Sequence, residues 1–105
     1  MNRFLASLAV AAVLGLPASA FAHSPKMDCF DNGDGSVTCQ GGFSDGSSAA
    51  GVALKIQDST DKVLNEMKFD ANGEATFKKP SGDYKVMFDG GAGHQVTLDG
   101  KTIVE

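Results

Sequence analysis

The sequence contains one arginine, no tryptophan and one tyrosine, and only two cysteines and two histidines. That arginine, Arg3, lies within the first 22 residues, and the rest of the chain carries eight lysines against 13 acidic residues, a formal charge of −5. Such a chain lacks the clustered basic side chains that bind the phosphate backbone of nucleic acids. An acidic surface is equally unsuited to docking on anionic lipid. We therefore expect neither kind of binding.

Long hydrophobic runs are also missing. The longest, Leu5–Leu16, has about a dozen residues, whereas a membrane-spanning helix needs about 20. The run follows a basic start and ends at Pro17, and the small residues of Ala18–Ala22 come next. These are the three parts of a secretory signal. We therefore predict that residues 1–22 are a cleaved signal peptide. Residues 23–105 then form a single domain that is periplasmic or secreted and not inserted in a membrane.

The two cysteines, Cys29 and Cys39, flank a segment rich in turn-forming residues. An Asn-Gly pair and an Asp-Gly pair occupy positions 32–35, and they provide the positive φ angles that a tight hairpin requires. An even cysteine count in an exported chain favours a disulfide. Closing this loop stabilises a small domain by roughly 2–3 kcal/mol. The alternative is that both cysteines bind a soft metal such as Cu(I).

The remainder of the chain alternates apolar and polar residues with a period of two, and no stretch has the helical period of 3.6. A last hairpin is expected around Asp99-Gly100. Short strands separated by a turn about every ten residues are typical of an antiparallel sandwich. The predicted fold is therefore all-β, a small antiparallel β-sandwich. The expected strands are 52–57, 63–69 (with Val63, Met67 and Phe69 on one face), 75–77, 84–88, 96–98 and 102–104.

Two segments in the middle of this region resemble a known family. Asp70–Phe77 reads DANGEATF and Pro80–Val86 reads PSGDYKV. They are similar to the D-x-x-G-x-x-x-F…P-x-G-x-Y-x-V pattern of prealbumin-like sandwiches, notably carboxypeptidase regulatory-like domains. The resemblance spans about residues 51–98, and it implies a fold more than a function, because such modules serve as spacers, adhesion units and binding domains.

A shorter segment, Gly90–His94 (GGAGH), resembles the Gly-His loop of exported nickel/cobalt-uptake accessory proteins. That resemblance implies a role in metal uptake. His94 and His23 are the only imidazoles of the chain, and His23 lies at the expected cleavage junction. Cleavage after Ala22 makes His23 the first residue, so that its α-amine and ring nitrogen can chelate one metal ion. This arrangement resembles the histidine brace of exported copper proteins, and His94 is the natural third nitrogen ligand.

Cleavage after Ala20 is the other option. It leaves a free N-terminus with histidine as the third residue, which resembles the amino-terminal copper and nickel motif. The amine, two backbone amides and the imidazole then form a square-planar nitrogen set suited to Cu(II) or Ni(II). The two options differ in whether His94 takes part. Met27 and Asp28 are close in sequence to His23 and are further candidates, as a thioether ligand and as an oxygen ligand or a partner of a ligand.

These observations predict an exported metal-binding protein that carries Cu(II) or Ni(II). Its expected partners are the metal ion and an envelope transporter or other envelope protein, so that it acts as a metal carrier or uptake accessory. The alternative is a structural or interaction module of the cell envelope that binds no metal. An enzyme is not expected. There is no Gly-x-Ser-x-Gly elbow to support a hydrolase, and residues 23–105 leave little room for a brace-type oxidative site together with a substrate surface.

Overall fold

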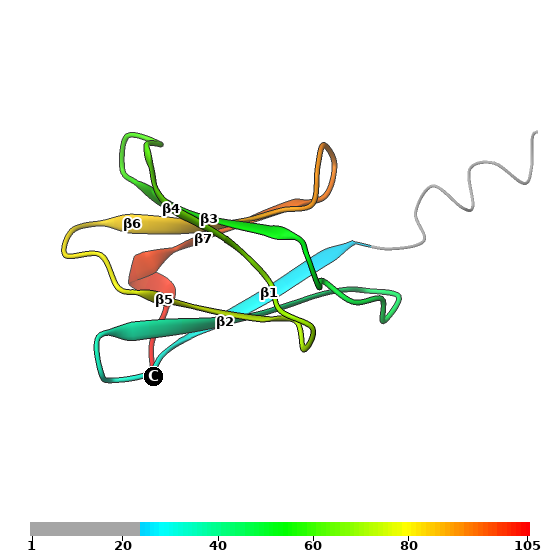
Figure 1. Cartoon of the computed structure of the whole chain (residues 1–105). Helices are drawn as coiled ribbons and strands as arrows, with labels where there is room; N and C mark the ends of the chain where they lie inside the picture. The colour runs from blue at the N-terminus through cyan, green and yellow to red at the C-terminus, as the bar shows by residue number, and fades with distance from the viewer. Residues whose placement is uncertain (1–23) are drawn as a thin grey trace, which may run out of the picture.

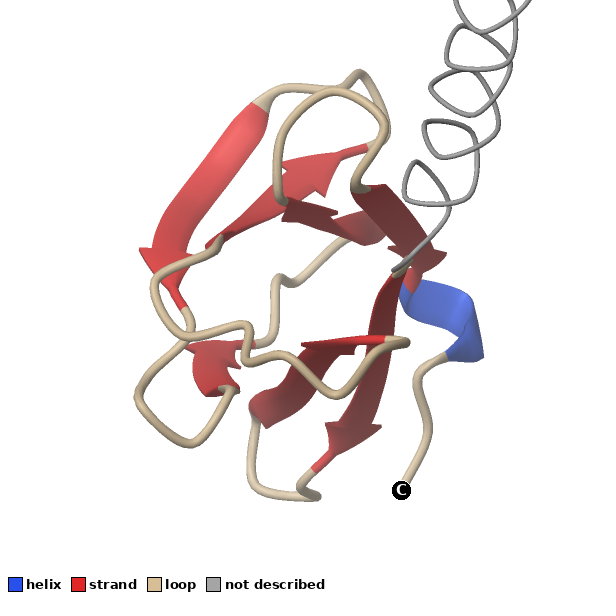
Figure 2. Cartoon of the chain, turned by 90° about the vertical axis from the view of Figure 1, so that its right-hand side faces the viewer, coloured by secondary structure: helices blue, strands red, loops and turns tan. Residues whose placement is uncertain are grey.

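The computed structural model describes residues 24–105, which form two antiparallel sheets packed face to face (Figure 1). The first sheet has the strand order β1-β2-β5 and the second the order β4-β3-β6-β7. Viewed from one end, the strands separate into two layers (Figure 2). The predicted antiparallel β-sandwich is therefore confirmed. The elements are β1 (Pro25–Asp31), β2 (Ser36–Phe43), β3 (Ala53–Asp58), β4 (Val63–Lys68), β5 (Glu74–Lys78), β6 (Tyr84–Asp89), β7 (Gln95–Asp99) and the 3₁₀ turn η1 (Gly100–Thr102). No helix within residues 24–105 is long and apolar enough to span a membrane.

Alternating burial forms the core, as β6 illustrates. Tyr84, Val86 and Phe88 are buried between the sheets, whereas Lys85 and Met87 on the same strand are partly exposed on the other face. Burying one large apolar side chain contributes roughly 1.5–3 kcal/mol, so the period of two in the sequence determines which face of each strand turns inward. The buried core residues are Met27, Val37, Cys39, Ala49, Leu54, Ile56, Phe69, Ala75, Phe77, Tyr84, Val86, Phe88 and Ile103.

The β1–β2 hairpin contains the predicted disulfide. Cys29 lies directly opposite Cys39 in the antiparallel register, with the two Cα atoms 4.0 Å apart, and the two sulfur atoms are bonded. Gly33 and Gly35 have φ angles of 80° and 91°, the positive values that the turn sequence predicts. Because the sulfur atoms are bonded to each other, neither is a thiolate ligand for Cu(I).

The hairpin expected around Asp99-Gly100 is wrong. The Asp99 carboxylate caps η1, and the N–H of Ile103 donates to the carbonyl of Gly100 at 3.1 Å, so the chain coils once instead of returning as a strand. Ile103 is then buried at the end of the core. The following residue, Val104, accepts a hydrogen bond from the N–H of Asp31 at 3.0 Å. The C-terminal segment thus pairs with the end of β1.

One predicted buried position on β4 is also wrong. Val63 is 44% exposed, Met67 is partly buried, and Phe69 is buried but follows the strand. The pairing of β3 with β4 shifts register between Ile56 and Gln57. A bulge of this kind re-aims side chains on one side of it, and β4 is the edge strand of its sheet. Val63 therefore faces solvent.

Candidate functional site

Three segments meet at the end of the sandwich where β1 begins. Figure 1 shows the first residues of β1 between the β2–β3 loop and the β6–β7 loop, on the side of the molecule opposite the C-terminus. The β6–β7 loop carries His94, and His23 directly precedes the described residues. The contacts that hold these segments determine whether the two histidines can share a metal ion.

Two hydrogen bonds fix the entry of the chain into the sandwich. The N–H of Ser24 donates to Oγ of Ser44 at 2.7 Å, and the N–H of Ser44 donates to the carbonyl of Ser24 at 2.8 Å. They extend the register of β1 and β2 by one pair beyond Pro25 and Phe43. We call this pair the Ser24–Ser44 clamp. It anchors the backbone at the residue that follows His23, which itself lies outside the described residues.

His94 is held by a tight glycine turn. Its N–H donates to the carbonyl of Gly91 and its carbonyl accepts from the N–H of Gly90, both at 2.9 Å. Gly91 and Gly93 have φ angles of 103° and 81°, which side chains with a Cβ rarely adopt. The imidazole packs edge-on against the ring of Phe43, with centroids 6.3 Å apart and an interplanar angle of 74°. His94 thus lies beside the strand end that forms the Ser24–Ser44 clamp.

Asp89 secures the base of this turn. Its carboxylate accepts hydrogen bonds from the N–H of Gly91 and from Nε2 of Gln95, each at 3.1 Å, and from Nζ of Lys55 at 2.9 Å. The hydrogen bond from Gln95, followed by those from Lys55 and Gly91, lowers the pKa of Asp89 from 3.8 to about 2. Asp89 is therefore ionised at physiological pH and ties the loop that carries His94 to β3.

The β2–β3 loop begins with a second tight turn. The N–H of Gly46 donates to the carbonyl of Phe43 at 2.9 Å, and the N–H of Phe43 donates to the carbonyl of Ser47 at 3.2 Å. Oδ1 of Asp45 accepts from both the N–H and the Oγ of Ser47, at 3.0 and 2.6 Å. This carboxylate therefore has a set orientation, one residue beyond the Ser24–Ser44 clamp.

The sequence analysis did not single out Asp45, although a signal for it was present. The disulfide prediction places Cys29 opposite Cys39, and continuing that register toward the N-terminus brings Ser24 opposite Ser44. The next position along each segment is 23 on one side and 45 on the other. The pairing of the cysteines thus points to the loop that faces the mature N-terminus.

The other predicted site residues lie apart from this end. Met27 is buried between the sheets, with 8% of its surface exposed, so its thioether belongs to the core. Asp28 is exposed on the outer face of β1, opposite Gln40. Within residues 24–105, no group of three or more His, Cys, Asp or Glu side chains is arranged to hold a metal ion.

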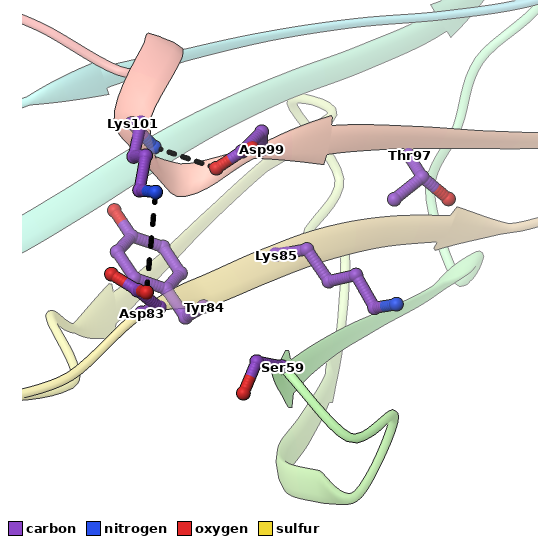
Figure 3. A pocket seen from close by; sticks show the side chains of 7 residues that line it. All are labelled: Ser59, Asp83, Tyr84, Lys85, Thr97, Asp99 and Lys101. Carbon is purple, nitrogen blue, oxygen red and sulfur yellow. Dashed lines mark hydrogen bonds and ion pairs between the residues drawn. The ribbon is translucent and has the colours of Figure 1, made fainter.

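A surface pocket of about 450 Å³ lies at the opposite end, beside the start of β6 (Figure 3). The hydroxyl of Tyr84 is buried there with no hydrogen-bond partner among the described residues, and burial raises the pKa of this phenol. Lys101 and Asp83 lie near it, with Nζ and Oδ2 4.0 Å apart. The pocket contains no imidazole or thiol, and we assign no chemistry to it. Its lining residues are Ser59, Asp83, Tyr84, Lys85, Thr97, Asp99 and Lys101.

Comparison with known proteins gives no relative. No family model matches the chain, and neither a curated protein nor a solved structure matches it significantly. The function is therefore argued from the residues at the end of the sandwich.

Proposed function

We propose that the mature protein binds Cu(II) or Ni(II) at its N-terminus, with His23 and His94 as ligands, and acts as a metal carrier or uptake accessory in the periplasm or outside the cell. The observation that supports this proposal is the position of Ser24. The Ser24–Ser44 clamp holds it next to Phe43, whose ring contacts His94. Covalent geometry limits the Cα of residue 23 to about 3.8 Å from that of Ser24.

The nitrogen set of this site suits late transition metals. When cleavage follows Ala22, the α-amine and imidazole of His23 chelate the ion, and the imidazole of His94 adds a third nitrogen. Cleavage after Ala20 would use backbone nitrogens instead and leave His94 without a role. The rigid placement of His94 beside the clamp favours cleavage after Ala22 and the three-nitrogen site.

Two further observations support export and a role in the envelope. A disulfide between Cys29 and Cys39 is typical of proteins in an oxidising compartment. The small-residue sequence before His23 fits signal cleavage at that point. A metal carrier in this compartment has to release its ion to a partner, for which we propose an envelope transporter or other envelope protein.

The test uses the full-length chain exported from a secreting host. Intact mass establishes the first residue, and titration with Cu(II) and with Ni(II), followed by calorimetry and electron paramagnetic resonance, measures affinity and nitrogen ligation. We expect His23→Ala and His94→Ala each to weaken binding at least tenfold. Unchanged affinity in both variants would overturn the proposal. Loss in His23→Ala alone would show the amino-terminal motif without His94.

A metal-free interaction module is the second candidate, and the edge strand β4 favours it. Val63 and Leu64 are 44% and 48% exposed on this strand, whose outer side pairs with no other strand in the described part of the chain. Such an edge can receive an additional strand from another protein. This candidate predicts that Cu(II) and Ni(II) leave the unfolding temperature of the exported protein unchanged.

A further inference from the structure

We propose that Asp45 is a third protein ligand of this metal ion, so that a carboxylate oxygen binds it together with the nitrogens of His23 and His94. The inference rests on the proposed metal site and goes beyond it, because it adds an oxygen donor from the β2–β3 loop.

The strand register carries the inference. β1 and β2 run antiparallel, and the Ser24–Ser44 clamp is their last pair at this end. One residue further along each segment is position 23 on the β1 side and Asp45 on the β2 side. Side chains at opposed positions of an antiparallel pair have Cβ atoms about 4.5–5.5 Å apart. That spacing is within the reach of two side chains that bind a common ion.

The same loop also approaches His94. Phe43 lies two residues before Asp45 and contacts the imidazole, with ring centroids 6.3 Å apart. The turn formed by the N–H of Gly46 and the carbonyl of Phe43 folds Asp45 back over the end of β2. His94 and Asp45 are therefore carried by two tight turns that share one aromatic side chain between them.

The carboxylate of Asp45 is prepared for this role by its own loop. Both hydrogen bonds from Ser47, from its N–H and its Oγ, go to Oδ1. A ligand that is already oriented by hydrogen bonds loses less conformational freedom on binding, and such partners typically affect metal affinity 10–100-fold. We assign Oδ2 as the oxygen that binds the metal.

An oxygen ligand also sets the preference among metals. A carboxylate favours harder divalent ions and offsets part of their charge, whereas Cu(I) prefers sulfur donors. Met27, the thioether nearest in sequence to His23, is buried in the core. The site therefore selects Cu(II) or Ni(II) over Cu(I).

The chain contains a matched control for Asp45. Asp34, in the β1–β2 turn at the other end of the hairpin, accepts from the N–H and Oγ of Ser36 at 3.0 and 2.6 Å, the same distances as in the loop of Asp45. Both aspartates are followed by glycine and serine. Asp34→Asn and Asp45→Asn thus change the same local hydrogen bonds, but only Asp45→Asn changes the end of the sandwich that carries His94.

The test compares exported Asp45→Asn, Asp34→Asn and wild type by calorimetric titration with Cu(II) and Ni(II), and by electron paramagnetic resonance of the Cu(II) form. We expect Asp45→Asn to weaken binding at least tenfold and to shift the copper spectrum toward more nitrogen character. Asp34→Asn should stay within twofold of wild type. Equal affinities and spectra in the two variants would overturn the role of Asp45.

A second variant separates ligation from loop structure. Ser47→Ala removes the Oγ donor but keeps the carboxylate, so it should bind metal far better than Asp45→Asn. If the two variants lose affinity equally, Asp45 acts through the loop and the inference is wrong. If His23→Ala abolishes binding while Asp45→Asn binds as wild type does, the metal site stands and Asp45 is no ligand. If wild type binds no metal, the proposed function fails first.

Discussion

The imidazole of His94 packs against the ring of Phe43 at a centroid distance of 6.3 Å, and this contact joins the two sheets at the end where the chain enters the sandwich. Phe43 ends β2 in one sheet, and His94 lies between β6 and β7 of the other. The ring of Phe43 also meets that of Phe88 edge-on, with centroids 5.6 Å apart. A single aromatic side chain thus positions the turn of His94 against the core.

Phe43→Leu should therefore weaken both folding and metal binding. Edge-to-face aromatic pairs are worth about 0.5–1.5 kcal/mol beyond the area they bury, and we expect a loss of unfolding free energy in that range, measured by urea denaturation. The metal affinity of the exported variant should fall severalfold, because the support of His94 is lost. Phe30→Leu is the control, since Phe30 is 42% exposed on β1. A Phe43→Leu variant with wild-type affinity would show that His94 needs no such support.

The sequence predicts the fold well where burial alternates strictly. Leu54 and Ile56 on β3, and Tyr84, Val86 and Phe88 on β6, are all buried as their period of two indicates. In these strands each inward position is worth enough free energy to determine the register by itself.

The C-terminal segment was mispredicted because its local signals conflict with its packing. Residues 102–104 have the β-branched composition of a strand, and the Asp-Gly pair before them has that of a hairpin turn. The structure instead buries Ile103 at the end of the core, which the coiled path of η1 permits and a hairpin does not. Sequence patterns describe a strand and its immediate turn, but not the open end of a sandwich that a side chain must fill.

The candidate site divides in the same way. The glycines around His94 signal a tight turn, and the structure has one, with positive φ at Gly91 and Gly93. Asp45 carries no such signal, because the same Asp-Gly-Ser sequence occurs at 34–36 with the same local hydrogen bonds. Only the pairing of β1 with β2 distinguishes the two aspartates, and that pairing is a property of the hairpin as a whole.

Gly100→Ala should destabilise the protein by about 1–3 kcal/mol, the usual cost of overpacking. A Cβ at this position would lie 2.5 Å from Cε1 of Tyr84, whose ring packs edge-on against Phe77 and cannot retreat without disturbing the core. Urea denaturation measures the effect. Gly82→Ala is the control, because a Cβ there meets nothing within 4 Å. Equal stability of the two variants would contradict the packing of η1 on Tyr84.

The pKa of Asp89 predicts a loss of stability in acid. Its pKa is about 2 in the folded protein and about 3.9 in an unfolded chain. The folded state therefore binds this proton more weakly, and the stabilisation is complete above about pH 4 and is lost as the pH falls toward 2. Denaturation midpoints measured across this window should decrease, and they should decrease less in Asp89→Asn. The slope will not vanish, because the pKa values of Asp31 and Asp58 are lowered as well. An identical slope in the variant would contradict the bonds from Gln95, Lys55 and Gly91.

Metal should raise the unfolding temperature of the exported protein in a way that depends on pH. Ligand at 100 times its Kd stabilises the folded state by about 2.7 kcal/mol, which scanning calorimetry with Cu(II) or Ni(II) resolves easily at pH 7.5. Below about pH 6 the effect should shrink, because protons compete for an α-amine with a pKa near 8 and for imidazoles with pKa values near 6.5. Adding one alanine before His23 moves the α-amine away from the imidazole and should remove most of the stabilisation at either pH. If the extended protein gains as much from metal as wild type does, the amine is no ligand and the site has to be sought away from the N-terminus.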